Sequence, residues 1–136
     1  MDTRTREGTT MATKTVEGGC VCGDVRYRLN DDEIVGGGMC YCANCRVAHG
    51  APGSAWISVP ANGVTFTSGE PAVYAYTRED GRAAQRGFCG KCGSQLTYYA
   101  AGEPRTDITT CTLDDPEAFP PKGSTWEEEK LSWVDA

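Results

Sequence analysis

Hydrophobic and polar residues alternate along several short stretches of the chain. In residues 24–30, the apolar side chains of Val25, Tyr27 and Leu29 are separated by charged or polar residues. Because successive side chains of a strand point to opposite faces of a sheet, this alternation predicts a half-buried strand. Similar short stretches, bounded by glycine, proline or acidic turn residues, follow at 34–39, 55–59, 64–67, 73–76, 83–89, 95–99 and 107–113. Strands at this spacing predict an all-β sandwich or a barrel-like sheet.

Helical signals in the sequence are short. Residues 44–49 are long enough for one helical turn, which Gly50 would end. A second short helical turn is expected at 126–130. No stretch has the period of a long amphipathic helix, and none approaches the ~18 apolar residues that a membrane helix needs. The predicted fold class is therefore all-β, mainly strands with short helical turns.

We divide the chain into a flexible N-terminal arm, residues 1–13, and a single β domain, residues 14–136. The arm has no apolar periodicity, and either Met1 or Met11 would serve as its start. The rest of the 136-residue chain is long enough for one modest core and too short for two.

The last part of the predicted domain differs in composition from the rest. Residues 114–136 are acidic and contain prolines, which predicts a segment that wraps around the domain. Its expected anchors are Trp126, Leu131 and Trp133. Aromatic residues there would also suit a contact between two copies of the chain.

The charge distribution narrows the range of partners. The chain has 13 basic and 19 acidic residues, a formal net charge of −6. Residues 1–102 carry ten of each sign, whereas residues 103–136 carry nine acidic and three basic residues. An acidic excess repels phosphate groups, so we expect neither a nucleic-acid surface nor an anionic membrane surface. The polar first residues contain no secretory leader, which favours a cytoplasmic protein with reduced cysteines.

Seven of the eight cysteines lie in three tight clusters. The clusters are C-V-C at 20–22, C-Y-C-A-N-C at 40–45 and C-G-K-C at 89–92. Cysteines this close in sequence suit a shared metal ion better than a disulfide, which would close a strained ring. A thioredoxin-like redox pair at 89–92 would need a βαβ setting, whereas its flanks have the pattern of two strands joined by a turn. Glycine after each cysteine of this pair, Gly90 and Gly93, suits a metal-binding turn.

The seven clustered cysteines divide most simply into four and three. A structural zinc ion takes four protein ligands, and a catalytic zinc ion commonly takes three and keeps one open position. The four-cysteine group would be Cys20, Cys22, Cys89 and Cys92. The three-cysteine group would be Cys40, Cys42 and Cys45.

Two other partitions stay open on spacing alone. Cys42 and Cys45 could join Cys89 and Cys92 as a zinc ribbon, although the 43 residues between the pairs exceed the usual spacing. Alternatively, Cys111 could complete the three-cysteine group. Our expectation for Cys111 is a small buried residue on a strand.

The remaining candidate residues are expected to have structural roles and no part in the chemistry. His49, the single histidine of the chain, is expected to cap the short helix or to lie on the surface. Trp56, Tyr98 and Tyr99 are expected in the core. The charge run at 127–129 is expected to be solvated.

Four motifs in one order resemble a known family. They are G-G-C-V-C-G-D-V-R-Y at 18–27, C-Y-C-A-N-C-R-V-A-H-G-A-P at 40–52, T-S-G-E-P-A at 67–72 and F-C-G-K-C-G-S-Q-L at 88–96. Together they resemble the glutathione-dependent formaldehyde-activating enzymes, a family that includes the related domain of centromere protein V. The resemblance extends over residues 17–134. It implies an Mss4-like β fold stapled by zinc, with a structural zinc on the four-cysteine group and a catalytic zinc on the three-cysteine group.

The resemblance also implies an activity, with two zinc ions per chain as cofactors. The family reaction joins glutathione to formaldehyde to give S-hydroxymethylglutathione, and it is classed as a carbon–sulfur lyase reaction. The thiol must react as a thiolate, and zinc with an open position can bind a thiol or polarise an aldehyde oxygen. Catalysis would then fall to Cys40, Cys42 and Cys45. Arg46 is the candidate for binding a carboxylate of glutathione.

One position departs from the family pattern, and one alternative function stays open. Tyr41 stands where the family commonly has histidine, and tyrosine transfers protons less readily at neutral pH. The alternative is a non-enzymatic, zinc-stapled β domain that binds a small thiol or a protein partner. That alternative requires four protein ligands on each metal, whereas the enzyme requires an exchangeable position.

Overall fold

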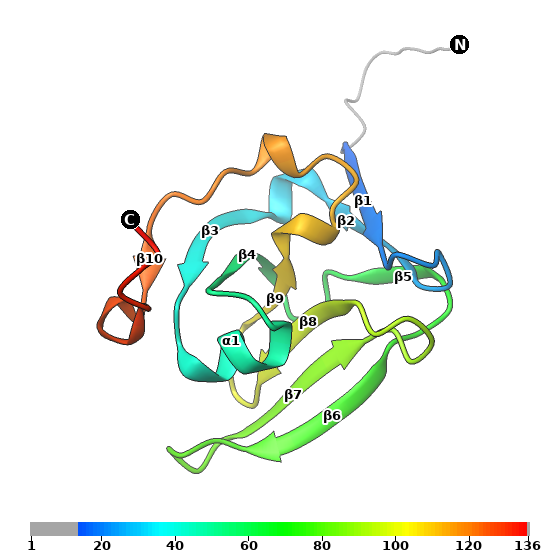
Figure 1. Cartoon of the computed structure of the whole chain (residues 1–136). Helices are drawn as coiled ribbons and strands as arrows, with labels where there is room; N and C mark the ends of the chain where they lie inside the picture. Colours follow the sequence, from blue (N-terminus) through cyan, green and yellow to red (C-terminus); the bar gives the residue numbers. More distant parts are fainter. Residues whose placement is uncertain (1–13, 136) are drawn as a thin grey trace.

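The computed structural model describes residues 14–135, and within them two β-sheets and one α-helix make up the fold (Figure 1). The chain is mostly β, as the alternation of apolar and polar residues predicts. The arm expected over residues 1–13 lies outside the described residues.

The smaller sheet has three antiparallel strands in the order β1-β2-β5. They are β1 (Thr15–Gly19), β2 (Arg26–Asn30) and β5 (Thr65–Ser68). β2 and β5 match predicted strands. β1 was not predicted, because Val16 is the only apolar side chain between its threonine and its two glycines.

The larger sheet has the strand order β10-β3-β4-β9-β8-β7-β6. Its neighbouring strands are antiparallel, except that β10 runs parallel to β3 at the edge. Six strands match predicted ones to within a few residues, and β10 was not predicted. The bounds are β3 (Val35–Cys40), β4 (Ser54–Pro60), β6 (Ala72–Thr77), β7 (Ala83–Phe88), β8 (Gln95–Ala100), β9 (Arg105–Thr109) and β10 (Ser124–Thr125).

The core is formed where the two sheets face each other. Ile57 and Val59 of β4 and Ile108 of β9 pack with Tyr27 and Leu29 of β2, and all five are buried. Each large apolar side chain buried in this way contributes about 1.5–3 kcal/mol to folding. Because strand side chains alternate, the intervening residues of β4 and β9 face the other side of the larger sheet.

One short α-helix follows β3. This helix, α1 (Ala43–His49), begins after Cys42, whose sulfur accepts a hydrogen bond from the backbone N–H of Cys45. It ends at Gly50, which has a φ of 62° and therefore adopts the left-handed conformation that glycine tolerates. The short helix and its glycine stop are as predicted. No helix in residues 14–135 is long and apolar enough to cross a membrane.

The strand predicted over 107–113 is too long. β9 ends at Thr109, and a 3₁₀ turn, η2 (Thr110–Thr112), follows. Cys111 lies on this turn and is exposed, so the expectation of a buried cysteine on a strand is wrong. Within this turn, Thr112 Oγ1 donates a hydrogen bond to the backbone carbonyl of Thr109. Local bonds of this kind compete with strand pairing.

The C-terminal segment, residues 114–135, follows the outer edge of β3 (Figure 1). Backbone hydrogen bonds attach it, from Met39 N–H to Gly123 O (2.9 Å) and from Tyr41 N–H to Thr125 O (3.1 Å). A 3₁₀ turn, η4 (Glu127–Glu129), forms where a short helical turn was expected.

The two tryptophans that were expected to anchor this segment are not buried. Trp126 is 49% exposed and Trp133 is 61% exposed, so the expectation that they pack against the domain is wrong. Strand pairing and the packing of Phe119 against the core hold the segment instead, and Leu131, the third expected anchor, is half-buried. Trp126 also has a φ of 59°, the one positive φ of a non-glycine residue in the described chain, and such backbone costs about 1–2 kcal/mol.

Candidate metal centres and active-site pocket

The four-cysteine group joins two loops that are far apart in sequence. Cys20 and Cys22 follow β1, and Cys89 and Cys92 lie in the turn between β7 and β8. All four sulfurs lie within 4.8 Å of one another. The Cys20–Cys22 distance is 3.6 Å and the Cys22–Cys89 distance is 3.8 Å. Sulfurs on one tetrahedral zinc ion, each about 2.3 Å from the metal, would be about 3.8 Å apart, so the donor set fits zinc.

Backbone N–H groups surround these sulfurs. Val25 N–H donates to Cys20 Sγ (3.2 Å), and the N–H groups of Lys91 and Cys92 donate to Cys89 Sγ (3.4 Å each). Donors of this kind stabilise thiolates. Gly93 has a φ of 83°, which lets the loop turn back into β8. This group could therefore hold a metal ion that links the smaller sheet to the larger one.

The three-cysteine group lies at the junction of β3 and α1. Cys40 ends β3, Cys42 caps α1, and Cys45 lies in its first turn. The three sulfurs lie within 4.8 Å of one another, with 3.5 Å between Cys40 and Cys45. The hydrogen bond from the Cys45 thiol lowers the pKa of Cys40 to about 5. These sulfurs could hold a second metal ion with three protein ligands.

The two rival partitions of the cysteines are not found in the structure. Within residues 14–135, Cys42 and Cys45 cluster with Cys40 and not with the pair in the β7–β8 turn, so no zinc ribbon forms. Cys111 belongs to neither group. The three-cysteine group therefore has no fourth protein ligand from the described cysteines.

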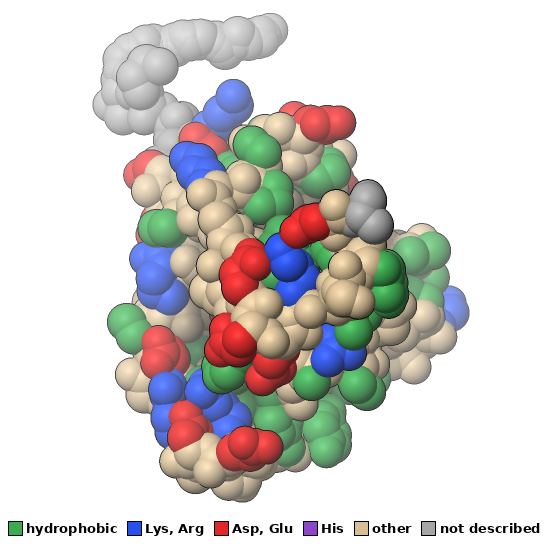
Figure 2. All heavy atoms as spheres, turned by 60° about the vertical axis from the view of Figure 1, so that its left-hand side comes forward, with side chains coloured by type: hydrophobic (Ala, Val, Ile, Leu, Met, Phe, Trp, Pro, Cys, Tyr) green, Lys and Arg blue, Asp and Glu red, His purple; other side chains and the backbone are tan. Residues whose placement is uncertain are grey.

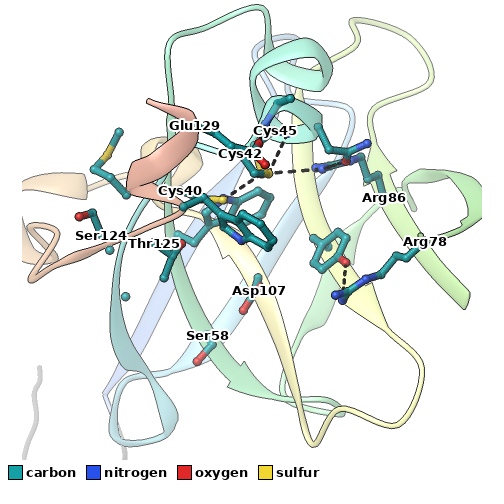
Figure 3. A pocket seen from close by; sticks show the side chains of 18 of the residues that line it. Cys40, Cys42, Cys45, Ser58, Arg78, Arg86, Asp107, Ser124, Thr125 and Glu129 are labelled. Carbon is teal, nitrogen blue, oxygen red and sulfur yellow. Dashed lines mark hydrogen bonds between the residues drawn. The ribbon is translucent and has the colours of Figure 1, made fainter. Parts of the chain in front are cut away.

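A pocket of about 1060 Å³ opens beside the three-cysteine group (Figure 3). Its floor is the face of the larger sheet that points away from the core. Successive cross-strand neighbours on this face are Ser58 of β4, Asp107 of β9, Tyr98 of β8 and Arg86 of β7. The C-terminal segment forms one wall, with Ser124, Thr125, Trp126 and Glu129.

Arg86 is a buried cation in this pocket. It is 6% exposed, and its Nη2 lies 3.8 Å from Cys45 Sγ and also donates to Asn44 Oδ1. Its guanidinium lies 5.2 Å from the centre of the Tyr98 ring, and its Nη1 has no hydrogen-bond partner in the described chain. No carboxylate among residues 14–135 pairs with it. A buried charge needs a partner, and the nearest candidates are the thiolates of the three-cysteine group.

Aromatic side chains also line the pocket. Trp56 and Tyr98 were expected in the core, but both are half-buried and line the pocket, with ring centres 6.3 Å apart. His49 packs edge-on against Trp56 at 5.4 Å. Burial, with the nearby charge of Arg86, lowers the pKa of His49, so this residue is neutral at pH 7.

A second, smaller cavity of about 460 Å³ adjoins the pocket. The two share lining residues, including Arg78 and Asp107. Arg78 forms an ion pair with Asp80 (2.9 Å) and donates to Tyr98 Oη (3.3 Å). Burial raises the pKa of Asp107 to about 6.

Arg46, the basic residue singled out from the sequence, is half-buried on α1 and does not line the pocket. The basic residues that line the pocket are Arg78, Arg86 and Lys122, which sequence reasoning missed, and Arg86 contacts a cysteine sulfur. One signal was available for Arg86: it is a charged residue in the middle of a predicted strand, directly before a glycine. Its burial and orientation depend on strand pairing, which the sequence does not state.

The C-terminal wall of the pocket is attached to the helix that carries the cysteines. Glu129 Oε1 accepts a hydrogen bond from the backbone N–H of Ala43, at the start of α1 (2.7 Å). Lys130 lies 5.2 Å from the centre of the Tyr41 ring and pairs with Asp135 (2.5 Å). Figure 2 shows acidic side chains, with basic ones among them, on the face where this segment lies; of the segment's acidic residues, Glu129 lines the pocket.

Known proteins resemble this chain in sequence and in fold. A family model described as "Glutathione-dependent formaldehyde-activating enzyme" matches residues 15–129, which include both cysteine groups and all the residues that line the pocket. A crystal structure of a Rhodobacter sphaeroides protein has a similar fold, with a TM-score of 0.53 and 22% sequence identity. That similarity covers 72% of this chain and 87% of the other chain. No curated protein matches the chain.

Proposed function

The chain belongs to the family of glutathione-dependent formaldehyde-activating enzymes, and on this basis we propose that it is a zinc-dependent carbon–sulfur lyase. The proposed reaction joins glutathione to formaldehyde to give S-hydroxymethylglutathione. One observation carries the proposal: three cysteine sulfurs that could share a metal open onto a pocket of about 1060 Å³. A pocket of this size accommodates a tripeptide thiol.

We assign different roles to the two cysteine groups. The four-cysteine group would hold a structural zinc, because its donor set is complete and its cysteines link two sheets. The three-cysteine group would hold the catalytic zinc, which when bound favours the thiolate form of a thiol and polarises an aldehyde oxygen. Cys40, Cys42 and Cys45 are its proposed ligands.

The charge of the second group makes Arg86 important. Three thiolates with one divalent ion have a net charge of −1, and the buried guanidinium 3.8 Å from Cys45 Sγ offsets it. Arg86 would thereby also limit the electron density that the three sulfurs donate to the bound metal ion. Its cation–π contact with Tyr98 and its hydrogen bond to Asn44 keep it beside the cysteines.

The pocket walls would position the thiol substrate. Trp56 and Tyr98 provide apolar surface that excludes water around the reacting groups. Glutathione carries two carboxylates, and we assign contact with one of them to Arg78, which lines the pocket, in place of Arg46, which does not.

The non-enzymatic alternative is less well supported. A purely structural second site would need a fourth protein ligand, and the described cysteines supply three. A protein-binding module would also have no need of a concave site beside the metal ligands. We further propose a cytoplasmic location, because all eight cysteines are free thiols, a state that reducing compartments maintain.

The activity can be tested by NMR exchange spectroscopy on formaldehyde and glutathione. We expect the wild-type protein to exchange free formaldehyde with its glutathione adduct faster than the spontaneous reaction does. Cys42→Ser should lose this acceleration while remaining folded, and Cys111→Ser, an exposed cysteine outside both groups, should retain it. A wild-type rate equal to the spontaneous rate, with several thiols and aldehydes, would contradict the proposal.

A further inference from the structure

Asp107 is a carboxyl group in the floor of the pocket. Its side chain lines both cavities, at the place where they join. The strand register makes it a direct neighbour of Tyr98, which is in turn the neighbour of Arg86. Cross-strand neighbours on one face are about 5 Å apart, so this row leads from Asp107 to the guanidinium that contacts Cys45. Figure 3 shows Asp107 and Ser58 on the floor beneath the three cysteines.

This carboxyl group has no partner in the described part of the chain. The three arginines of the smaller cavity are engaged elsewhere, and Arg82 pairs with Glu103 (2.5 Å). Arg78 pairs with Asp80, and Arg105 donates to Ser58 Oγ (2.8 Å) and to the backbone carbonyl of Glu33 (2.7 Å). Its oxygens are not among the fully buried side-chain atoms that lack a partner, so the pocket leaves them open to water and to a bound substrate. A structural role therefore does not explain the residue.

The surroundings of Asp107 also suit proton transfer near neutral pH. Burial is the main cause that raises its pKa to about 6; Glu103 and Cys40 add to the rise and Arg105 opposes it. A carboxyl group in this range can both accept and donate a proton at neutral pH. The titratable and charged side chains that share its two cavities are Cys40, Cys42, Cys45, Tyr76, Arg78, Glu79, Asp80, Arg82, Arg86, Tyr98, Glu103, Arg105, Lys122 and Glu129.

We propose that Asp107 is the general acid–base of thiol addition to the aldehyde, a role that rests on the proposed function. The carboxylate accepts the proton of the substrate S–H group, directly or through one water molecule. A sulfur electron pair forms the C–S bond, and the π pair of the carbonyl moves to its oxygen. The protonated carboxyl then donates the same proton to that oxygen. One S–H bond and one C–O π bond break, one C–S bond and one O–H bond form, and no other reactant is consumed.

The test compares Asp107→Asn with the wild type in the NMR exchange assay, after subtraction of the spontaneous rate. General acid–base catalysis contributes about 10²–10⁴-fold, so we expect a loss of at least about 100-fold. The wild-type enzymatic rate should rise as the pH increases through about 6, since the carboxylate form is required, and Asp107→Asn should lack this rise. Asp107→Glu should recover part of the rate. Asp32→Asn, which changes an exposed carboxylate outside the pocket, should match the wild type.

Two further readouts separate catalysis from folding. Zinc content and melting temperature should not fall in Asp107→Asn. In the wild type, the side-chain carboxyl ¹³C signal that is missing from this variant should titrate near 6. A rate within about twofold of wild type with an unchanged pH profile, or a joint loss of zinc and activity, would overturn the proposal. A wild-type protein without activity on any thiol–aldehyde pair would instead refute the proposed function itself, so the two failures are distinguishable.

Discussion

The guanidinium Nη2 of Arg86 lies 3.8 Å from the sulfur of Cys45, and both side chains are buried. This contact places a fixed positive charge beside three cysteines that together would carry three negative charges. It also explains why a buried arginine is tolerated without a carboxylate partner. The pairing makes the properties of the three-cysteine group depend on a strand, β7, that contributes none of its sulfurs.

The first prediction concerns metal affinity. Arg86→Gln removes the charge and keeps a hydrogen-bonding side chain, so the anionic metal site loses its compensation. Zinc affinity at the three-cysteine group should fall about 10–100-fold, the usual effect of losing a partner of the metal ligands. Chelator competition measures this, and Arg28→Gln, at an exposed position on β2, is the matched control. Equal affinities for the two variants would contradict the expectation.

The second prediction separates the two cysteine groups by stability. Cys89 is 1% exposed within the core cluster, and its group links two sheets. Structural zinc sites contribute about 10–16 kcal/mol of apparent binding free energy, comparable with or larger than the whole stability of a domain, so Cys89→Ser should unfold the protein. Cys42→Ser should remain folded with one zinc equivalent. Circular dichroism and metal analysis check this, and an unchanged melting temperature for Cys89→Ser would refute our assignment.

The third prediction concerns pH and stability at Asp107. Its folded pKa, about 6, lies above the ordinary value of an unfolded aspartate, so ionisation disfavours the folded state. The effect is absent at low pH, grows as the pH rises from about 4 to about 6, and is constant above that. Asp107→Asn removes it and should be more stable than wild type by about 1–2 kcal/mol at neutral pH, after allowance for the remaining solvent exposure.

Urea denaturation at about pH 4.5 and about pH 7.5 measures this difference. The advantage of Asp107→Asn should be clearly smaller at the lower pH. Asp32→Asn should show no such dependence. A variant less stable than wild type at neutral pH would mean that Asp107 has a structural partner.

The fourth prediction concerns the attachment of the C-terminal segment. A Cβ at Gly38 would collide with the backbone carbonyl of Gly123, whereas a Cβ at Gly36 would meet only the flexible end of Lys122 at 3.6 Å. Gly38→Ala should therefore loosen β10 at a cost of about 1–3 kcal/mol, and Gly36→Ala should not. Hydrogen exchange of the amides of Met39 and Tyr41, which bond to this segment, reports the change. Equal protection in both variants would contradict it.

The sequence predicted most of the strands and the division of the cysteines. Alternation at residues 24–30 marks β2 because its apolar side chains face a core, and Gly50 marks the end of α1 because it adopts a positive φ. The four-and-three grouping follows from coordination numbers and is the one that the structure brings together.

The pocket was not predictable in the same way. Alternation shows that Trp56 and Ile57 face opposite sides of β4, but both are apolar, and only the position of the second sheet decides which one is buried. Asp107 and Arg86 lie in one row of cross-strand neighbours, with Tyr98 between them. The row depends on the register of three strands, which is a long-range property. The two-residue strand β10 is too short to have any pattern.

A zinc ion held between the β1–β2 loop and the β7–β8 turn, as we propose for the four-cysteine group, would also impose an order on synthesis. Cys22 and Cys89 are 67 residues apart. At about 5–20 residues per second, a ribosome would need roughly 3–13 s to deliver the second pair of thiols after the first. During that interval, the first pair is exposed on a nascent chain that cannot yet close the site. The protein's yield in a cell should therefore depend on the redox state and on zinc supply while it is being made, well before either affects the finished molecule.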